Sequence, residues 1–378
     1  MDFSFTEEQE AIRTLASEIL AAEMSAERIK AAEREPDWVD AALWRKLAEA
    51  NLLGVAIPER FGGMGMGFLE LCMLLHEVGR QVAPGPWLAT LVHGALPLAE
   101  FGSDAQRAAW LPRVAAGTAK LAAALLDAGS AEGAPPATRA RHDSGSVVLD
   151  GVKRAVPGAG SADLLLVPAS DERGVGIYLV GRQAPGVSLT GAATSTGEPL
   201  FDVTLSGVRV SKDARLGGSA ADGAAVLRWL APHALTAVAA LQAGVSDSAL
   251  RITAGYVKER VQFGVPIGSF QAVQHREADG FIDLEAMRWT LWLAAWRLAE
   301  GLPAERDAAV AKFWAAEGGS RIANASLHLH GGLGSDIDYP IHRHFLWSKA
   351  LELQGGGASA TLAWLGAELA RTAPGGIR

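Results

Sequence analysis

The sequence predicts an α+β protein of several domains: an N-terminal helical domain, a small middle β domain of barrel or sandwich type, and a C-terminal four-helix bundle. Two patterns predict this order. Apolar residues recur at helical spacing in the first and last parts of the chain, and short alternating runs replace this spacing in the middle. The 378 residues also exceed what one ordinary core holds. We place the domains at 1–118, 119–219 and 220–378.

The N-terminal segment has the pattern of amphipathic helices. Thr6 followed by Gln9 predicts a capping box, in which each side chain bonds a backbone N–H of the other residue. A helix is expected from this cap through Ala22, and further helices at about 38–51 and 67–78.

The middle segment predicts short strands separated by turns. Ser146–Leu149 meets Asp150 and Gly151, a dipeptide that is typical of hairpin turns, and the stretch 131–145 is expected to be a loop. Further strands are predicted at Leu164–Val167, Val175–Val180 and Val203–Val210.

The C-terminal segment returns to helical spacing. Helices are predicted at about 234–258, 271–300, 304–327 and 346–371. Trp289, Trp292 and Trp296 lie at i, i+3 and i+7, which places them on one helix face. We interpret this stripe as core or subunit-interface packing rather than a cofactor site.

Composition excludes several classes of function. A net charge of −8 argues against non-specific nucleic-acid binding, and no apolar run of membrane-spanning length lacks a charge or a Gly/Pro break. Cys72 is the only cysteine, so neither an intrachain disulfide nor a cysteine metal cluster is possible. The N-terminus lacks the pattern of a secretory signal, and a reducing, cytoplasmic setting is expected.

Four groups of short motifs stand in a fixed order along the chain. They are PERFGG (58–63) with HEVGR (76–80), GVKRAVPGAGSAD (151–163), YVKERVQFGVPIGSFQ (256–271), and HLHGGLG (328–334) with Tyr339 and Pro340. Each alone is a weak signal, but together they resemble the acyl-CoA dehydrogenase family over essentially the whole chain.

The resemblance implies an FAD shared across a subunit boundary. In this family the β domain of one protomer holds the flavin ring, while the helical bundle of its neighbour holds the diphosphate and adenine. An arginine fork suits phosphate oxygens, so Arg260 is the candidate diphosphate contact. The same motifs make Phe263, Gln271, His328, Gly331 and Gly332 candidate cofactor residues. Taken outside the motif, Arg260 would be an ordinary surface charge, and the two glycines would simply end a helix.

The sequence departs from the family at the catalytic base. The family removes the α-proton of a thioester with a glutamate from one of two positions, which fall here on Gly355 and Ala234. We therefore predict no catalytic residue in this chain. His233 and Glu352 are nearby groups that could replace the base, although each has a simpler structural interpretation.

A second departure concerns the flavin ring. The family's Trp-Ile-Thr segment corresponds here to Ala155–Pro157, and Pro157 has no N–H to donate. The upstream segment 126–130 keeps only Gly129 and Ser130, and His328 replaces a glutamine. The residues that would hold the flavin ring in this chain are therefore mostly replaced. The residues that would hold the diphosphate of a neighbour's FAD are retained.

This asymmetry predicts the partner subunit of an α2β2 heterotetramer that completes the FAD site of a homologous catalytic subunit. The resemblance implies an acyl-CoA substrate, steroid-like or otherwise bulky, with electron-transfer flavoprotein as acceptor. Two alternatives remain open: a self-sufficient homotetramer with a displaced base, and a structural or regulatory relative without flavin contact. A metal enzyme built on His328, His330, His342 and His344 is disfavoured, since few carboxylates stand at ligand spacing.

Overall fold

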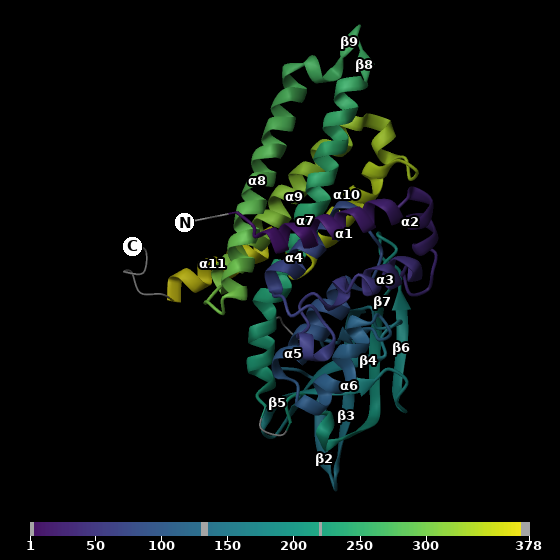
Figure 1. Ribbon diagram of the computed structural model, residues 1–378. Coiled ribbons are helices and arrows are strands. Elements are labelled where there is room, and N and C mark those ends of the chain that lie inside the picture. The colour runs from purple at the N-terminus through teal and green to yellow at the C-terminus, as the bar shows by residue number, and fades with distance from the viewer. Residues whose placement is uncertain (1–3, 130–134, 219–220, 372–378) are drawn as a thin grey trace. The chain divides into compact units, whose positions relative to one another are not determined.

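The structure is a computed structural model that describes residues 4–129, 135–218 and 221–371 (Figure 1). The chain forms two compact units, each described separately below. One comprises Met1–Ala26, Phe68–Ala83 and Pro232–Arg378, and the other comprises Glu27–Gly67 and Pro84–Ala231.

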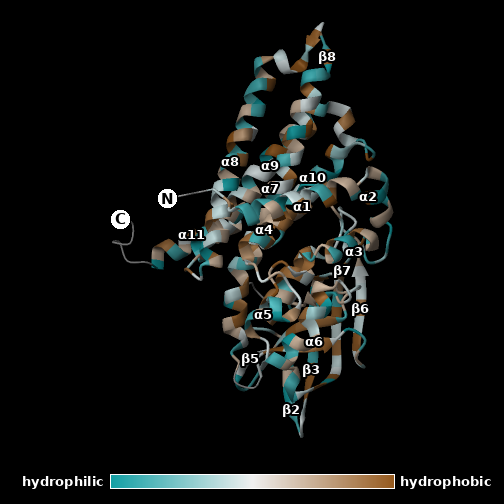
Figure 2. Ribbon diagram, in the orientation of Figure 1, coloured by the Kyte–Doolittle hydropathy of each residue, from teal (hydrophilic) through white to brown (hydrophobic). Residues whose placement is uncertain are grey.

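The first unit is helical. Its elements are α1 (Glu7–Glu23), α4 (Phe68–Arg80), most of α7 (Gly223–Glu259), β8 (Val261–Gln262), β9 (Val265–Pro266), η5 (Ile267–Ser269), α8 (Gln271–Ala299), α9 (Glu305–His330), η6 (Gly331–Ser335), α10 (Pro340–Leu353) and α11 (Ala358–Arg371). Helix α9 packs against α8, α10 and α11. Hydrophobic and hydrophilic residues alternate along these helices (Figure 2), as expected when one face is buried.

Glycines allow α4 and α7 to cross at close range. A Cβ atom at Gly79 would lie 2.1 Å from the carbonyl oxygen of Leu241, and one at Gly244 would lie 2.0 Å from that of His76. Any larger residue would force the two backbones apart. The crossing buries α4 from Phe68 to Gly79.

The predicted capping box is confirmed. The Thr6 N–H donates to Gln9 Oε1 at 2.9 Å, and the Gln9 N–H donates to Thr6 Oγ1 at 3.2 Å. Helix α1 begins at the next residue, Glu7. The reciprocal pair satisfies two backbone donors that the first turn would otherwise leave unpaired.

The predicted single helix at 346–371 is wrong. Two helices, α10 and α11, are separated at 354–357, where Gly355 and Gly356 adopt φ of +73° and +97°. Glycine enters this left-handed region at little cost, so the three consecutive glycines end the helix.

The tryptophan stripe on α8 is only partly buried. Trp292 packs edge-on against Phe5, with ring centroids 5.2 Å apart, whereas Trp289 and Trp296 are 57% and 46% exposed. The stripe is therefore half-buried at its centre and exposed on either side.

The second unit combines short helices with a sheet. Its helices are α2 (Ala26–Ala32), α3 (Ala41–Glu49), η1 (Leu52–Gly54), η2 (Glu59–Phe61), the π-helix η3 (Leu88–Ala95), α5 (Leu96–Phe101), α6 (Asp104–Ala115) and η4 (Lys212–Ala214). Its strands are β1 (Leu121–Ala123), β2 (Arg139–Asp143), β3 (Ser146–Pro157), β4 (Leu164–Asp171), β5 (Gly174–Gly181), β6 (Val187–Ala192) and β7 (Leu200–Ser211).

The strands form one seven-stranded sheet in the order β1-β4-β2-β3-β7-β6, with β5 paired to β4. Only β1 and β2 run parallel to their neighbour β4, and the other pairs are antiparallel. This sheet between helical segments confirms the predicted fold class.

The hairpin turn predicted at Asp150 and Gly151 is wrong. Strand β3 continues through both residues with a bulge between Leu149 and Gly151, and the turn lies between Asp143 and Ser146. The predicted loop 131–145 is also wrong in part: 131–134 fall outside the described residues, but Arg139–Asp143 forms β2. Its polar sequence shows no strand pattern, and pairing with β3 imposes the extended conformation.

A buried ion pair lies in the sheet unit. Lys153 is fully buried and its Nζ donates to Asp127 Oδ2 at 2.6 Å, while the Thr138 N–H donates to Asp127 Oδ1 at 2.8 Å. Gly151 lies against this group, since a Cβ there would be 2.8 Å from Thr138 Cα. The pair is closely packed and leaves the carboxylate well satisfied.

Candidate functional site

The segment after α7 displays an aromatic side chain at the tip of a hairpin. Strands β8 and β9 are joined by Phe263 and Gly264, whose φ values of +55° and +82° are those of a type I′ turn. Phe263 is 93% exposed and meets Phe270 edge-on. A type I′ turn requires positive φ at both central residues, so the hairpin places Phe263 in this conformation and leaves its ring exposed.

Arg260 lies at the base of this hairpin. Its N–H donates to Tyr256 O and its carbonyl accepts from Ile267 N, both at 2.8 Å, so the backbone is fixed at the end of α7. The side chain is exposed. Gln271 follows the hairpin as the first residue of α8.

The end of α9 contains the other predicted residues. Gly331 ends the helix with φ +58° and ψ −136°, a conformation that strongly favours glycine. No atom lies within 4 Å of a Cβ placed at Gly331 or Gly332. Gly331 is therefore required by its backbone angles, and the space beside both glycines is open.

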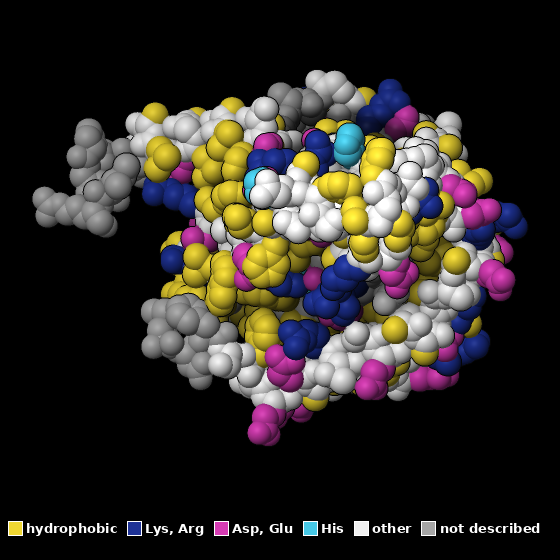
Figure 3. All heavy atoms as spheres, turned by 90° about the horizontal axis from the view of Figure 1, so that it is seen from above, with side chains coloured by type: hydrophobic (Ala, Val, Ile, Leu, Met, Phe, Trp, Pro, Cys, Tyr) yellow, Lys and Arg dark blue, Asp and Glu magenta, His cyan; other side chains and the backbone are white. Residues whose placement is uncertain are grey.

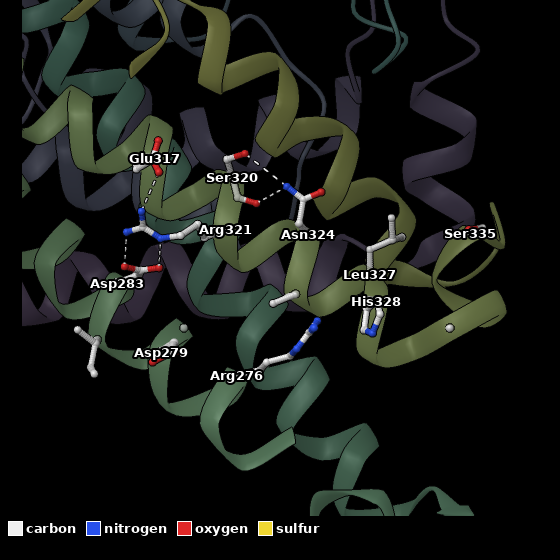
Figure 4. Close-up of a pocket in the computed structure, with 14 residues that line it drawn as sticks. Arg276, Asp279, Asp283, Glu317, Ser320, Arg321, Asn324, Leu327, His328 and Ser335 are labelled. Atoms are coloured by element: carbon white, nitrogen blue, oxygen red, sulfur yellow. Dashed lines mark hydrogen bonds and ion pairs between the residues drawn. The ribbon is translucent and has the colours of Figure 1, made fainter. Parts of the chain in front are cut away.

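A groove of about 1200 Å³ lies between α8 and α9. Its walls are formed by Arg276, Asp279, Gly280, Ile282 and Asp283 of α8, by Glu317, Ser320, Arg321, Asn324, Ala325, Leu327 and His328 of α9, and by Gly331 and Ser335 of η6. In Figure 4 the Arg276 side chain extends from α8 toward the part of α9 that carries His328.

The charges in this groove are unevenly paired. Arg321 donates to Asp283 Oδ2 and to Glu317 Oε1, each at 2.8 Å, and these bonds raise the pKa of the guanidinium (Figure 4). Arg276 makes no ion pair with any residue that the structure describes. It is thus the guanidinium left available for an anion at the His328 end of the groove.

Only some of the predicted cofactor residues line the groove. His328 and Gly331 line it, whereas Arg260, Phe263, Gln271 and Gly332 do not. Arg276 was missed from the sequence. The available signal was a polar stripe at helical spacing, Arg276, Asp279 and Asp283 on α8, facing a similar stripe on α9.

One expected position of the base lies against the residue that follows the other position in sequence. A Cβ atom at Gly355 would lie 2.9 Å from Leu235 Cδ2, and Leu235 directly follows Ala234. His233 is buried and packs edge-on against Phe68, with ring centroids 4.7 Å apart. Neither position carries a carboxylate.

Two titratable side chains near Gly355, those of Lys312 and Glu352, lie at the end of helix α10. Lys312 is buried, and its Nζ donates to the carbonyl oxygens of Leu351 at 3.3 Å and Glu352 at 2.9 Å. Burial lowers the pKa of Lys312 to about 8, and the Glu352 carboxylate opposes this shift. Glu352 itself accepts from Lys349 Nζ at 2.9 Å.

The predicted ring segment lacks free donors. The Ala155 N–H donates to Asp202 Oδ1 at 3.2 Å, Asp202 also pairs with Arg154, and Pro157 has no N–H. In the upstream segment, Asp127 is used by Lys153, and Ser130 falls outside the described residues. Among the described residues of these segments, Ala155 and Pro157 thus offer no free N–H to a flavin ring, whereas Arg276 and His328 place donors of the kind that bind phosphate along the α8–α9 groove.

Two of the histidines proposed as an alternative metal site, His330 and His344, serve packing. His330 stacks on Tyr256 with ring centroids 4.3 Å apart, and His344 Nδ1 lies 2.9 Å from Pro340 O. Burial lowers the pKa of both rings. Across the described ranges, no group of three or more His, Cys, Asp or Glu side chains could hold a metal ion.

Comparison with known proteins places the chain in a family. Residues 6–118 match the acyl-CoA dehydrogenase N-terminal domain, and residues 221–368 match the acyl-CoA dehydrogenase C-terminal domain. The chain therefore belongs to the acyl-CoA dehydrogenase family, whose members are FAD-dependent oxidoreductases.

Particular relatives cover nearly the whole chain. The acyl-CoA dehydrogenase FadE27 of Mycobacterium tuberculosis (strain ATCC 25618 / H37Rv) is 38% identical over 98% of this chain and 100% of its own length. A structure of a variant of the Tcur3481-Tcur3483 steroid ACAD is 44% identical, with a TM-score of 0.89 over 96% of this chain and 98% of its own. The ChsE4-ChsE5 complex from M. tuberculosis is 38% identical, with a TM-score of 0.92 over 98% and 100%.

One helix within the described ranges, α7, is long and apolar enough to cross a membrane by length and composition alone. Of its most apolar stretch, 56% is buried inside the protein, as in the core helix of a folded unit. This is weak evidence for a membrane span.

Proposed function

We propose that this chain is the partner subunit of an α2β2 acyl-CoA dehydrogenase and completes the FAD site of a homologous catalytic subunit. The observation that carries the proposal is an asymmetry between two sets of residues. The groove between α8 and α9 keeps an unpaired guanidinium at Arg276 beside His328, while Gly355 and Ala234 occupy the positions of the base.

The retained half would hold the diphosphate and adenine end of FAD. Arg260 precedes the exposed hairpin in the sequence and Arg276 follows it, and each carries a permanent positive charge. Charge-assisted hydrogen bonds to phosphate are among the stronger polar contacts. Phe263 offers an exposed aromatic face, which suits an adenine ring. Gln271, Gly331 and Gly332 would line the approach to the diphosphate.

FAD, when bound, supplies the hydride acceptor of the dehydrogenation. A base must remove the α-proton of the thioester at the same time, and such a base contributes roughly 10²- to 10⁴-fold in rate. This chain does not place one. His233 is packed on Phe68, and the amine of Lys312 donates its protons to backbone carbonyls.

Exposed apolar side chains support an assembled protein. Trp289, Leu293 and Trp296 of α8 are 57%, 46% and 46% exposed, a surface of the kind found at subunit interfaces. Seen from the hairpin end, hydrophobic side chains gather on the surface with Lys and Arg side chains among them (Figure 3). Such a mixture suits a protein partner better than bulk water.

The similar proteins indicate the kind of complex and substrate. Two structures with TM-scores of 0.89 and 0.92 are described as a steroid ACAD and as a ChsE4-ChsE5 complex. We therefore propose a steroid or similarly bulky acyl-CoA as the substrate of the assembly. Electron-transfer flavoprotein is the proposed electron acceptor.

Purification of the chain alone and with a catalytic subunit tests the proposal. The chain alone should be colourless and inactive, and the co-purified complex should be yellow and should oxidise an acyl-CoA. A yellow, active homomer would instead establish a self-sufficient enzyme with a displaced base. An Arg260→Ala complex with unchanged flavin content would indicate a structural relative that makes no flavin contact.

A further inference from the structure

The helical unit brings three element ends together around one side chain, that of His330. This residue is the last of α9, directly before Gly331, and it is only 3% exposed. Tyr256 lies on α7 one turn before Arg260, and Tyr339 is the residue directly before α10. The proposed function uses Arg260 and Gly331, whereas it gives no role to His330.

Aromatic contacts hold the three ends together. The His330 ring stacks on Tyr256, with ring centroids 4.3 Å apart and planes inclined by 23°. It also meets Tyr339, with centroids 5.2 Å apart. Burial and the neighbouring Tyr256 and Glu259 raise the pKa of Tyr339, which agrees with a phenol beside the end of α7. The His330 ring therefore bridges the end of α7 and the start of α10.

A hydrogen bond fixes the orientation of the His330 ring. Its Nδ1 lies 2.8 Å from the carbonyl oxygen of Ser326, one turn earlier on α9. Because a carbonyl oxygen only accepts, Nδ1 carries the proton of this bond. Burial lowers the pKa of His330, which favours the neutral ring. The contact with Tyr256 is thus a stack of two uncharged rings, and the backbone of α9 sets its orientation.

The stack connects two parts of the proposed diphosphate site. On one side, the Arg260 N–H donates to Tyr256 O at 2.8 Å, at the end of α7. On the other side, Gly331 turns the chain into η6, and a Cβ atom at Gly334 would lie 3.2 Å from the Cβ of His330. Arg260 does not line the α8–α9 groove, so its place relative to Gly331 depends on how the ends of α7 and α9 pack.

We propose that His330 is a positioning residue, which acts through the Tyr256 stack to set the end of α7, and with it Arg260, against the Gly331 end of α9. Because His330 is almost completely buried, it acts on FAD only through these neighbours. An arginine fork bonds phosphate oxygens within narrow limits of distance and angle, so its placement matters. This inference rests on the proposed function, in which Arg260 and Gly331 hold the diphosphate of FAD.

The flavin affinity of the complex with a catalytic subunit tests the inference. FAD is removed from the assembled complex and returned by titration, flavin fluorescence reports binding, and a thermal melt of each variant reports stability. His330→Ala should weaken FAD binding roughly tenfold, as expected for coupled neighbours. His330→Phe keeps a ring in the stack and should recover most of the affinity. Failure of His330→Phe to recover it would overturn a role for the stack.

His344→Ala is the matched control. His344 is also buried in the helical unit, and its Nδ1 lies 2.9 Å from the carbonyl oxygen of Pro340, one turn earlier. This variant should lower the melting temperature about as much as His330→Ala and leave the flavin affinity unchanged. Tyr256→Leu removes the other ring of the stack and should reproduce the loss, so it provides the test if His330→Ala does not fold.

A double variant shows whether His330 acts through Arg260. If it does, His330→Ala combined with Arg260→Ala should bind FAD about as weakly as Arg260→Ala alone, because both changes remove the same contact. Additive losses would overturn the inference, and so would equal flavin affinity in His330→Ala and His344→Ala. In either case a loss in Arg260→Ala alone would leave the partner-subunit proposal standing. Full flavin affinity in Arg260→Ala would overturn that proposal and this inference with it.

Discussion

The family pattern would bring this chain to a flavin at two places, the α8–α9 groove and strand β3. The two places differ in the polar groups they leave available. At the groove, Arg276 is unpaired and Gly331 keeps a backbone conformation that favours glycine. At β3, the Ala155 N–H is bonded to Asp202 and Pro157 has no donor. Under the proposed function, the groove would serve the flavin of the neighbouring subunit, and strand β3 would hold no flavin ring.

The sheet itself is fully formed, including its buried polar contacts. The buried Lys153–Asp127 pair and its bond to Thr138 remain in place. Similarly, Lys312 still holds the end of α10 although the loop that follows carries Gly355 instead of a base.

A restored base would be expected to give the largest effect, a gain in activity, and we predict that this gain is absent. Gly355→Glu restores the carboxylate, yet the isolated variant should show no measurable dehydrogenation, although a well-placed base contributes roughly 10²- to 10⁴-fold. Its Cβ would lie 2.9 Å from Leu235 Cδ2 and φ is +73°. Under the proposed function, moreover, the catalytic partner and not this chain holds the flavin ring. An acyl-CoA oxidation assay measures this, with Gly357→Glu as the control. Turnover by the isolated variant would contradict the loss of the ring half.

The next effect concerns stability. Lys153→Met should lower the free energy of unfolding of the sheet unit by about 3–5 kcal/mol, because Asp127 would remain buried and charged. Arg141→Ala, which breaks the exposed pair with Asp150, should change it by less than about 1 kcal/mol. Chemical denaturation measures both. Equal effects would show that the buried pair does not support the sheet.

A smaller effect is expected in the α8–α9 groove, which we propose holds the diphosphate of FAD. Arg276→Ala should weaken FAD retention by the assembled complex roughly tenfold to a hundredfold, since bonds to a charged group contribute about 1.5–3 kcal/mol. Lys258→Ala removes an equal charge outside the groove and is the control. Flavin release during dialysis gives the comparison. Equal retention by the two variants would remove Arg276 from the site.

The last expected effect is a pH dependence of stability. Because the pKa of Lys312 is about 8 in the folded state against 10.5 ordinarily, the unfolded chain binds more protons between these values. The free energy of unfolding should therefore gain roughly 2–3 kcal/mol from this group as pH rises from 8 to 10.5. Lys312→Met should lack this gain. Parallel pH profiles for both proteins would show that the amine is not perturbed.

The sequence predicted well where local chemistry decides the structure. The Thr6 capping box and the order of helical and β segments follow from spacing alone. It failed where tertiary contacts decide. Strand β2 is extended because β3 pairs with it, and β3 continues through Asp150 and Gly151 with a bulge that no dipeptide signal predicts.

The same division applies to the candidate site. Motifs identified His328 and Gly331, which line the groove, but Arg276 carries no motif and joins them only because α8 packs on α9. The proximity of Gly355 to Leu235 likewise depends on helix packing across more than a hundred residues of chain.

The number of flavins in the purified complex with a catalytic subunit tests the central claim most directly. Native mass spectrometry gives the subunit composition, and flavin absorbance after denaturation gives the cofactor content. We predict two flavins for every four chains, because each site joins a ring half from the partner to a diphosphate half from this chain. Four flavins for every four chains would show that this chain also holds a flavin ring, and would contradict the account.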